Sequence, residues 1–171
     1  KLAEVIREAD VTPGVVNIIT GGGETGKMLV KHPDVNKVAF TGSTEVGKFI
    51  MKTLAGSGKR YTLELGGKAA NIIFEDAAIN QAVEGIVDAI FFNQGHVCCA
   101  GSRLYVQESV AKEVISKLKD RMNTLVIGDP LDNNTDIGAI NSRMQLEKIC
   151  ENVDIGKKEG GSVYQPSCTL P

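Results

Sequence analysis

Two adjacent cysteines, Cys98 and Cys99, stand in the segment FFNQGHVCCAGSR and carry the most reactive side chains of the sequence. Two phenylalanines end an apolar helical pattern, Gly95 interrupts it, and small residues separate the cysteines from the next strand pattern. A turn of this kind exposes a thiol and lets backbone N–H groups stabilise the thiolate, which is the nucleophilic form. Free cysteine is also among the most buried residue types, so an inert buried pair is the alternative interpretation.

A carboxylate, Glu64, stands in YTLELGGK, near the end of an expected strand over residues 60–65. Because side chains alternate along a strand, Leu63 and Leu65 share one face and Glu64 points to the other. The carboxyl end of such a strand is where ligands of open α/β sheets bind, a position that suits a general base. A solvent-facing or ion-paired glutamate is the alternative.

A glycine-rich segment, VAFTGSTEVGK, links a strand pattern to a helix pattern and contains Gly42, Ser43 and Gly47. At the start of a helix, free backbone N–H groups and the helix dipole favour a diphosphate. The Ser43 hydroxyl adds a further donor. The same residue types are also ordinary helix-start chemistry without a ligand, and the segment alone leaves both interpretations open.

A second glycine-rich segment, IITGGGETGKM over residues 18–28, resembles a phosphate-binding P-loop. Gly21, Gly26 and Lys27 match G-x-x-x-x-G-K-[ST], but Met28 stands where a hydroxyl would ligate magnesium. Successive glycines are equally typical of a tight structural turn. A P-loop nucleotide-binding domain is therefore kept as a rival hypothesis.

Strand and helix patterns alternate along the whole chain. The expected helices cover residues 2–9, 24–31, 44–55, 77–93, 110–124 and 142–152, and the expected strands cover 15–20, 37–41, 60–65, 71–74 and 103–107. This alternation predicts an α/β protein with an open, Rossmann-like parallel sheet. The pattern changes near Gly66 and Gly67, so two subregions are predicted to meet there.

Composition narrows the class of protein. The 171 residues, 42% of them hydrophobic and 23% charged, suffice for one ordinary globular core. A net charge of −2 gives no reason to expect nucleic-acid or membrane binding, and no run approaches the ~20 apolar residues of a membrane span. The four cysteines, Cys98, Cys99, Cys150 and Cys168, contain no C-x-x-C pair, so neither a metal site nor a disulfide framework is predicted and a reducing compartment fits best.

Taken together, FTGSTEVGK, LELGGK and FFNQGHVCCAGSR, in this order, resemble the aldehyde dehydrogenase superfamily. PGVVNIITG and GDPLDNNTDIGAI resemble its flanking segments, so the resemblance covers nearly the whole chain. Because the family's enzymes are substantially longer, the resemblance implies a central piece of such an enzyme. Residues 1–66 would be the C-terminal half of the dinucleotide-binding domain and residues 67–171 the N-terminal part of the catalytic domain. A cytoplasmic location is expected, and an organelle is the alternative, since any targeting segment would lie upstream of this chain.

The resemblance implies oxidation of a small-molecule aldehyde to a carboxylic acid, with NAD or NADP as cofactor and a homo-oligomeric parent enzyme. It assigns the nucleophile to Cys98, the third residue after Gly95, and the water-activating base to Glu64. It also assigns cofactor contacts: the diphosphate loop to Gly42, Ser43 and Gly47, a nicotinamide neighbour to Leu65, and a ribose contact to Gln145.

The chain departs from the family pattern at two places. His96 stands where the motif usually has glutamine, which bears on access to Cys98 or on its ionisation, and GKAAN replaces the commoner GKSPN. The resemblance further implies that the first βαβ units, which would bind adenosine, lie upstream of these residues. The asparagine that completes the oxyanion hole and a glutamate that contacts the nicotinamide ribose would also lie outside them, so the isolated segment is expected to be inactive. A non-catalytic interaction fragment or a pseudoenzyme segment is the remaining alternative.

Overall fold

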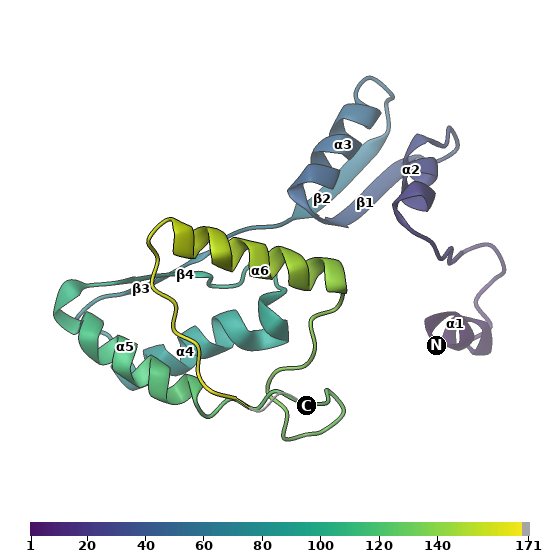
Figure 1. Ribbon diagram of the computed structural model, residues 1–171. Helices are drawn as coiled ribbons and strands as arrows, with labels where there is room; N and C mark the ends of the chain where they lie inside the picture. Colours follow the sequence, from purple (N-terminus) through teal and green to yellow (C-terminus); the bar gives the residue numbers. More distant parts are fainter. Residues whose placement is uncertain (169–171) are drawn as a thin grey trace. The chain divides into compact units, whose positions relative to one another are not determined.

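The computed structural model describes residues 1–168 and divides the chain into two compact units, Lys1–Leu65 and Gly66–Pro171 (Figure 1). The division falls where the sequence pattern changes. Each unit contains one pair of parallel strands, and helices flank them. The prediction of an α/β protein with parallel strands is confirmed. The assignment of the two units to a cofactor domain and a catalytic domain stays a prediction.

The first unit is built on β1 (Lys37–Gly42) and β2 (Arg60–Leu65), which pair in parallel. Helix α2 (Gly23–Lys31) packs on α3 (Thr44–Leu54), and α3 lies against both strands. Apolar side chains on one face of each helix form the core. Its buried members are Val30, Ile50 and Leu54, and Val38, Phe40, Phe49 and Leu63 pack against them.

The expected strand over residues 15–20 does not form. Helix α1 (Leu2–Glu8) is followed by an irregular segment in which Val15 N–H donates to the Thr12 carbonyl at 3.2 Å, closing a turn. Val15 and Ile19 are 68% and 62% exposed. The apolar run suggested a buried strand, but a strand needs a neighbour for its backbone groups and a cover for its side chains, and within residues 1–168 this segment has neither.

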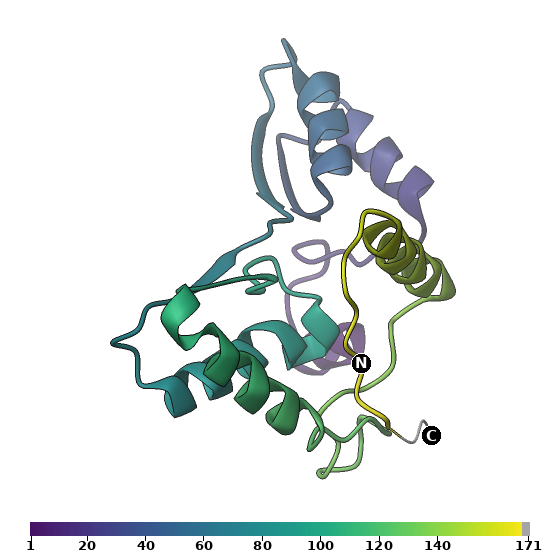
Figure 2. The ribbon, with the colours of Figure 1, turned by 60° about the vertical axis from the view of Figure 1, so that its left-hand side comes forward.

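The second unit pairs β3 (Ala70–Ile73) in parallel with β4 (Arg103–Val106). Helices α4 (Ile79–Phe91) and α5 (Glu108–Met122) pack side by side, as Figure 2 shows. Their contact buries Val83, Ile86, Val87 and Val114. The exposed rim of this contact carries polar pairs, among them Arg121 with Glu84 at 3.0 Å and Lys117 with Asn80 at 2.7 Å.

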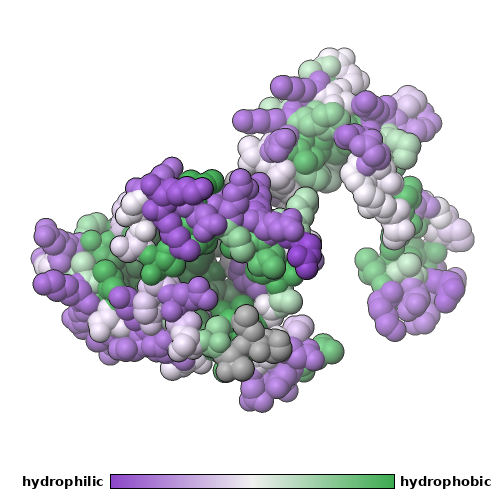
Figure 3. All heavy atoms as spheres, viewed as in Figure 1, coloured by the Kyte–Doolittle hydropathy of each residue, from purple (hydrophilic) through white to green (hydrophobic). Residues whose placement is uncertain are grey.

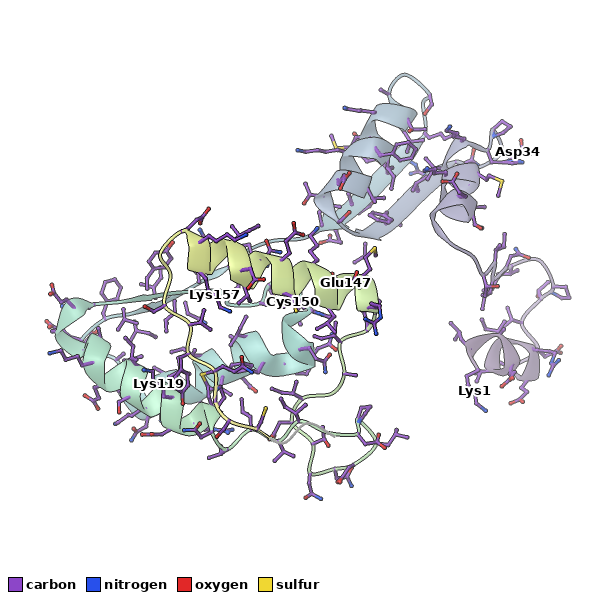
Figure 4. The ribbon with its side chains drawn as sticks, in the orientation of Figure 1. Lys1, Asp34, Lys119, Glu147, Cys150 and Lys157 are labelled. Carbon is purple, nitrogen blue, oxygen red and sulfur yellow. The ribbon has the colours of Figure 1, made fainter. Side chains whose placement is uncertain are left out.

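The last helix, α6 (Arg143–Lys158), continues beyond its expected end at residue 152. None of its residues is buried, and Glu147, Cys150 and Lys157 mark its length in Figure 4. The chain after α6 returns to α5. There the Tyr164 hydroxyl lies 3.2 Å from Asn123 Oδ1, and Lys119 Nζ lies 4.8 Å from the centre of the Tyr164 ring.

Both units leave large apolar side chains at their surfaces, which appear as green patches in Figure 3. In the second unit Ile72 and Phe74 are 60% and 62% exposed. Contiguous apolar surface of this kind is typical of faces that contact further protein. Among residues 1–168, none of the helices combines the length and the apolar composition needed to cross a bilayer.

Candidate active site

The diphosphate loop predicted at Gly42 and Ser43 joins the end of β1 to the start of α3. Ser43 is the N-cap of α3, and its hydroxyl oxygen accepts a hydrogen bond from Val46 N–H at 3.2 Å. Gly47 N–H donates to the Ser43 carbonyl at 3.0 Å. The Ser43 hydroxyl proton is not used by this cap, so capping and donation to a ligand are compatible. The structure therefore confirms that Ser43 caps the start of a helix, and its contact with a diphosphate stays a prediction.

Two glycines of this loop lie against side chains that leave no room for a Cβ atom. A Cβ at Gly47 would lie 2.6 Å from a methyl carbon of Leu65, and one at Gly42 would lie 2.4 Å from the ring of Phe40. Gly47 and Leu65, two predicted cofactor residues, are thus in direct packing contact. A side chain at position 47 would therefore require the Leu65 side chain to move.

Glu64 lies beside this loop, because the parallel register pairs Thr41 with Glu64 and Gly42 with Leu65. The carboxyl ends of both strands therefore meet at the same edge. Leu63 and Leu65 are half-buried while Glu64 is exposed, as the alternation predicted. The structure brings Gly42, Gly47, Glu64 and Leu65 together at one edge of the first unit.

The cysteines lie in the second unit, in a turn closed by Ala100 N–H donating to the Val97 carbonyl at 3.1 Å. Cys98 and Cys99 are the two central residues of this turn, and both are exposed. Ala100, which closes the turn, is 6% exposed. The backbone thus anchors the turn in the core and leaves the thiols exposed, so the pair is not buried among residues 1–168.

The turn that carries the cysteines, residues 97–100, is called the thiol turn. It is held by contacts with residues 67–71, which lead into β3. Asn71 Nδ2 donates to the Gly101 carbonyl at 3.2 Å, and Arg103 N–H donates to the Ala69 carbonyl at 3.2 Å. A Cβ at Gly67 would lie 3.0 Å from the Cys98 carbonyl oxygen. The GGK segment therefore passes so close to Cys98 that a side chain at Gly67 would displace the turn.

A run of left-handed backbone leads from α4 into the turn. Asn93, Gln94 and Gly95 have φ values of 49°, 55° and 74°, and a Cβ at Gly95 would lie 3.0 Å from the Ile90 carbonyl oxygen. Gly95 ends the helix, as predicted, but the strained conformation of the two residues before it was not foreseen. Left-handed non-glycine residues cost energy and cluster at functional sites.

His96 and Gln145 also lie in the second unit. His96 N–H donates to the Asn93 carbonyl at 2.9 Å, and its Nε2 is shielded from solvent with no hydrogen-bond partner within residues 1–168. Gln145 is half-buried in the first turn of α6, where its N–H donates to the Ser142 hydroxyl at 3.2 Å. This contact involves the Gln145 backbone, so the predicted ribose contact of its side chain stays a prediction.

Sequence analysis missed Gly67, Asn71 and Gly101 as residues that hold the thiol turn. Asn71 was seen only as the start of a strand, although an asparagine among apolar strand residues signals a specific hydrogen bond. The sequence signal for Gly67 was stronger, because a glycine next to a strand end marks a close backbone approach. Among residues 1–168, the structure contains no cluster of three or more side chains suited to a metal ion.

The geometry agrees with the comparison to known families, in which the model of the aldehyde dehydrogenase family matches residues 1–167. The chain belongs to the aldehyde dehydrogenase family. It is 48% identical over 163 residues to an aldehyde dehydrogenase of Davidiella tassiana and 47% identical over 165 residues to the mitochondrial aldehyde dehydrogenase of Homo sapiens. These matches cover 94% and 95% of this chain, but 33% and 32% of the relatives.

A similar structure is that of betaine aldehyde dehydrogenase from Staphylococcus aureus in complex with NAD⁺, with a TM-score of 0.91 and 36% identity. The alignment covers 96% of this chain and 33% of that one. The chain therefore spans about a third of the length of the aldehyde dehydrogenases it matches. The resemblance stated from the motifs is confirmed at the level of the family.

Proposed function

We propose that this chain supplies the thiol, the water-activating base and part of the cofactor site of an NAD- or NADP-dependent aldehyde dehydrogenase. The observation that carries the proposal is the exposed pair of thiols at the centre of a turn that is fixed from both flanks. A reactive thiol needs exposure to substrate and a rigid backbone around it. Membership of the family supports aldehyde oxidation as the reaction.

The chemistry assigned to the residues proceeds in two stages. The Cys98 thiolate adds to the aldehyde carbonyl, and the oxyanion of the resulting thiohemiacetal is stabilised by a backbone N–H group of the turn. Bound NAD or NADP supplies the hydride acceptor. The product on Cys98 is a thioester. Glu64 then takes a proton from water, whose oxygen adds to the thioester; the carboxylic acid leaves and the Cys98 thiolate is restored.

The first unit contains features that fit a dinucleotide. The first turn of α3 presents backbone N–H groups, and the glycines at positions 42 and 47 add no side chain of their own to the loop, which favours approach of a diphosphate to the backbone. The Ser43 hydroxyl adds a donor. Glu45 in the first turn opposes an anion there, so the N–H groups and Ser43 must supply the attraction.

An apolar cleft of about 480 Å³ in the same unit fits another part of a dinucleotide. It lies between α2 and α3, and Val30, Val38, Phe40, Val46 and Phe49 are among its lining residues. Val46 belongs to the first turn of α3, so the cleft adjoins the predicted diphosphate loop. A flat heteroaromatic base matches such a lining. We therefore propose that this cleft holds the adenine of the cofactor, which the resemblance alone placed upstream of these residues. The structure of the NAD⁺-bound relative supports this class of cofactor.

The proposal is tested first at the thiol. In the full-length enzyme, Cys98→Ala should abolish turnover of aldehyde, because no group remains to form the thioester. Cys99→Ala is the matched control, since Cys99 is the other exposed central residue of the turn, and it should keep most of the activity. Loss of activity in Cys99→Ala with activity retained in Cys98→Ala would show that the nucleophile is Cys99 and that the assignment to Cys98 is wrong.

The role of Glu64 is tested by separating the two stages in time. Glu64→Gln should leave a rapid burst of reduced cofactor and then slow turnover, because the amide cannot take a proton from water. Rapid-mixing absorbance measures both phases. If the variant showed no burst and its steady rate were near that of the wild type, Glu64 would not be the base that activates water.

The activity is assigned to an enzyme of the relatives' length, and the 171 residues alone are expected to be inactive. Hydride transfer requires the reacting atoms to be held within about 3.5 Å, and a small misplacement costs orders of magnitude in rate.

A thermal-shift series with NAD, NADP and ATP separates this function from a P-loop nucleotidase, because a ligand that binds only the native state raises its stability. Stabilisation by ATP alone would favour the nucleotidase. The homo-oligomeric state is a prediction that light scattering can test.

A further inference from the structure

Lys59 reaches from the segment before β2 to the end of α2. Its ammonium group donates to two backbone carbonyls there, that of Val30 at 3.2 Å and that of His32. His32 is the C-cap residue of α2, and Val30 lies in the last turn of this helix. The last carbonyls of a helix have no partner inside the helix and form the negative end of its dipole, so they favour a cation. Lys59 therefore supplies partners that α2 cannot supply itself.

The other attachments of α2 are modest. The helix packs on α3, and Val30 is its one buried residue. It begins after Gly22 without a side-chain cap. Lys59 stands next to Arg60, the first residue of β2, whose N–H donates to the Asn36 carbonyl at 3.1 Å. The ammonium group thus ties the end of α2 to the start of the strand pair.

The position of α2 sets the width of the apolar cleft between α2 and α3. Leu29 and Val30 line the cleft from α2, and Val46 and Phe49 line it from α3. One of the two carbonyls that Lys59 binds therefore belongs to a residue of the cleft wall. Lys59 itself does not line the cleft, so any effect that it has on a ligand there passes through α2.

We propose that Lys59 is a positioning residue for the cofactor, because it holds the α2 wall of the cleft in the arrangement that binds the adenine. This inference rests on the proposed function, since it takes the cleft as the adenine site. A wall that is fixed before the ligand arrives loses less conformational entropy on binding, and the ligand binds more tightly. Without the ammonium group, the packing of α2 on α3 has to hold the wall.

The first test measures the binding of ADP-ribose to the full-length apoenzyme by calorimetry, because ADP-ribose carries the adenine and lacks the nicotinamide. Lys59→Met keeps the length of the side chain and removes the ammonium group, so it should weaken binding about tenfold. In steady-state kinetics with NAD, the KM of this variant should rise by a similar factor while kcat changes less than about twofold. Hydrogen exchange of the α2 amides in the apoenzyme should be faster than in the wild type.

Three further variants make the result specific. Lys59→Arg keeps the charge and the donor groups, and its affinity for ADP-ribose should stay within about threefold of the wild type. Lys31→Met is the matched control, because it removes an exposed lysine from the same turn of α2 whose side chain forms no hydrogen bond within residues 1–168, and it should leave the affinity unchanged. Lys59→Gln keeps an uncharged donor and should weaken binding about threefold, so it carries the test if Lys59→Met does not fold.

The outcomes separate this inference from the proposed function. Unchanged affinity for ADP-ribose in folded Lys59→Met or Lys59→Gln would overturn the role of Lys59 and leave the dehydrogenase function intact. Equal losses of affinity in Lys59→Met and Lys31→Met, or in Lys59→Met and Lys59→Arg, would also overturn it. A wild type that neither binds ADP-ribose nor oxidises aldehydes with NAD or NADP would overturn both.

Discussion

Two segments of the first unit share the spacing Gly-x-x-x-x-Gly-Lys, at residues 21–27 and 42–48, yet they form different structures. The second follows β1, and the Ser43 hydroxyl caps the helix that it opens. The first follows irregular backbone, and α2 begins after Gly22 without a side-chain cap. The spacing of the glycines is therefore not enough to specify a ligand loop.

The second glycine of each segment shows the difference most clearly. A Cβ at Gly47 would meet the side chain of Leu65 at 2.6 Å, whereas a Cβ at Gly26 would meet nothing within 4 Å. Gly47 lets the start of α3 pack directly against the Leu65 side chain at the end of β2. Gly26 has no such neighbour, so its presence needs no packing explanation. A glycine contributes to a site when another element approaches it closely.

The largest expected effect is that of an alanine at each of these positions. Gly47→Ala forces Leu65 to move and should reduce the free energy of unfolding by about 1–3 kcal/mol. Gly26→Ala, the matched control, should increase it by up to about 1 kcal/mol, because alanine favours a helix interior where space is open. Equilibrium urea unfolding of the two variants measures both values.

Gly47→Ala also tests the link between packing and ligand, for which Gly26→Ala is not a control because Gly26 lines the cleft assigned to the adenine. If Gly47 shapes the diphosphate loop, Gly47→Ala should weaken binding of NAD in a fluorescence titration. A Gly47→Ala variant as stable as the wild type, or one less affected than Gly26→Ala, would remove the contrast between the two segments.

The sequence predicted the elements of both segments, apart from residues 15–20, because amphipathic spacing and strand alternation are local signals. It also predicted that Glu64 lies at the carboxyl end of its strand and faces away from Leu63 and Leu65, since side chains alternate along a strand. It did not predict that Gly47 packs on Leu65, or that Gly67 and Asn71 hold the thiol turn. Those contacts join residues far apart in the chain, and residue types alone do not specify them.

A smaller effect is expected from exchanging the caps of the two helices. Ser43→Ala removes the acceptor for Val46 N–H and should cost about 1 kcal/mol. Gly22→Ser places a hydroxyl at the N-cap of α2, where the backbone is already extended, with φ −89° and ψ −165°, and should gain a few tenths of a kcal/mol. Urea unfolding at one temperature compares the two.

Ser43→Thr serves as the control for the cap, because threonine keeps the hydroxyl. It should retain most of the stability that Ser43→Ala loses. Equal losses in Ser43→Ala and Ser43→Thr would mean that the hydroxyl is not what stabilises the start of α3.

The smallest effect concerns a charge pair that the two segments share in sequence but not in structure. Glu24 and Lys27 form an ion pair at 2.6 Å, while no ion pair joins Glu45 and Lys48 among residues 1–168. The hydrogen bond and charge of Lys27 hold the pKa of Glu24 below its ordinary value. A carboxyl whose pKa is lowered by folding adds stability above its unfolded pKa, about 4.3, and this stability is lost as the pH falls through the folded pKa.

Glu24→Gln should therefore be slightly less stable than the wild type at pH 7 and equal to it in acid. Because the pair is exposed, high salt should shrink the difference further. Thermal unfolding of the wild type, Glu24→Gln and the control Glu45→Gln between pH 7 and pH 3 measures it. A gap between the wild type and Glu24→Gln that widens towards acid would show that the pair does not stabilise the start of α2.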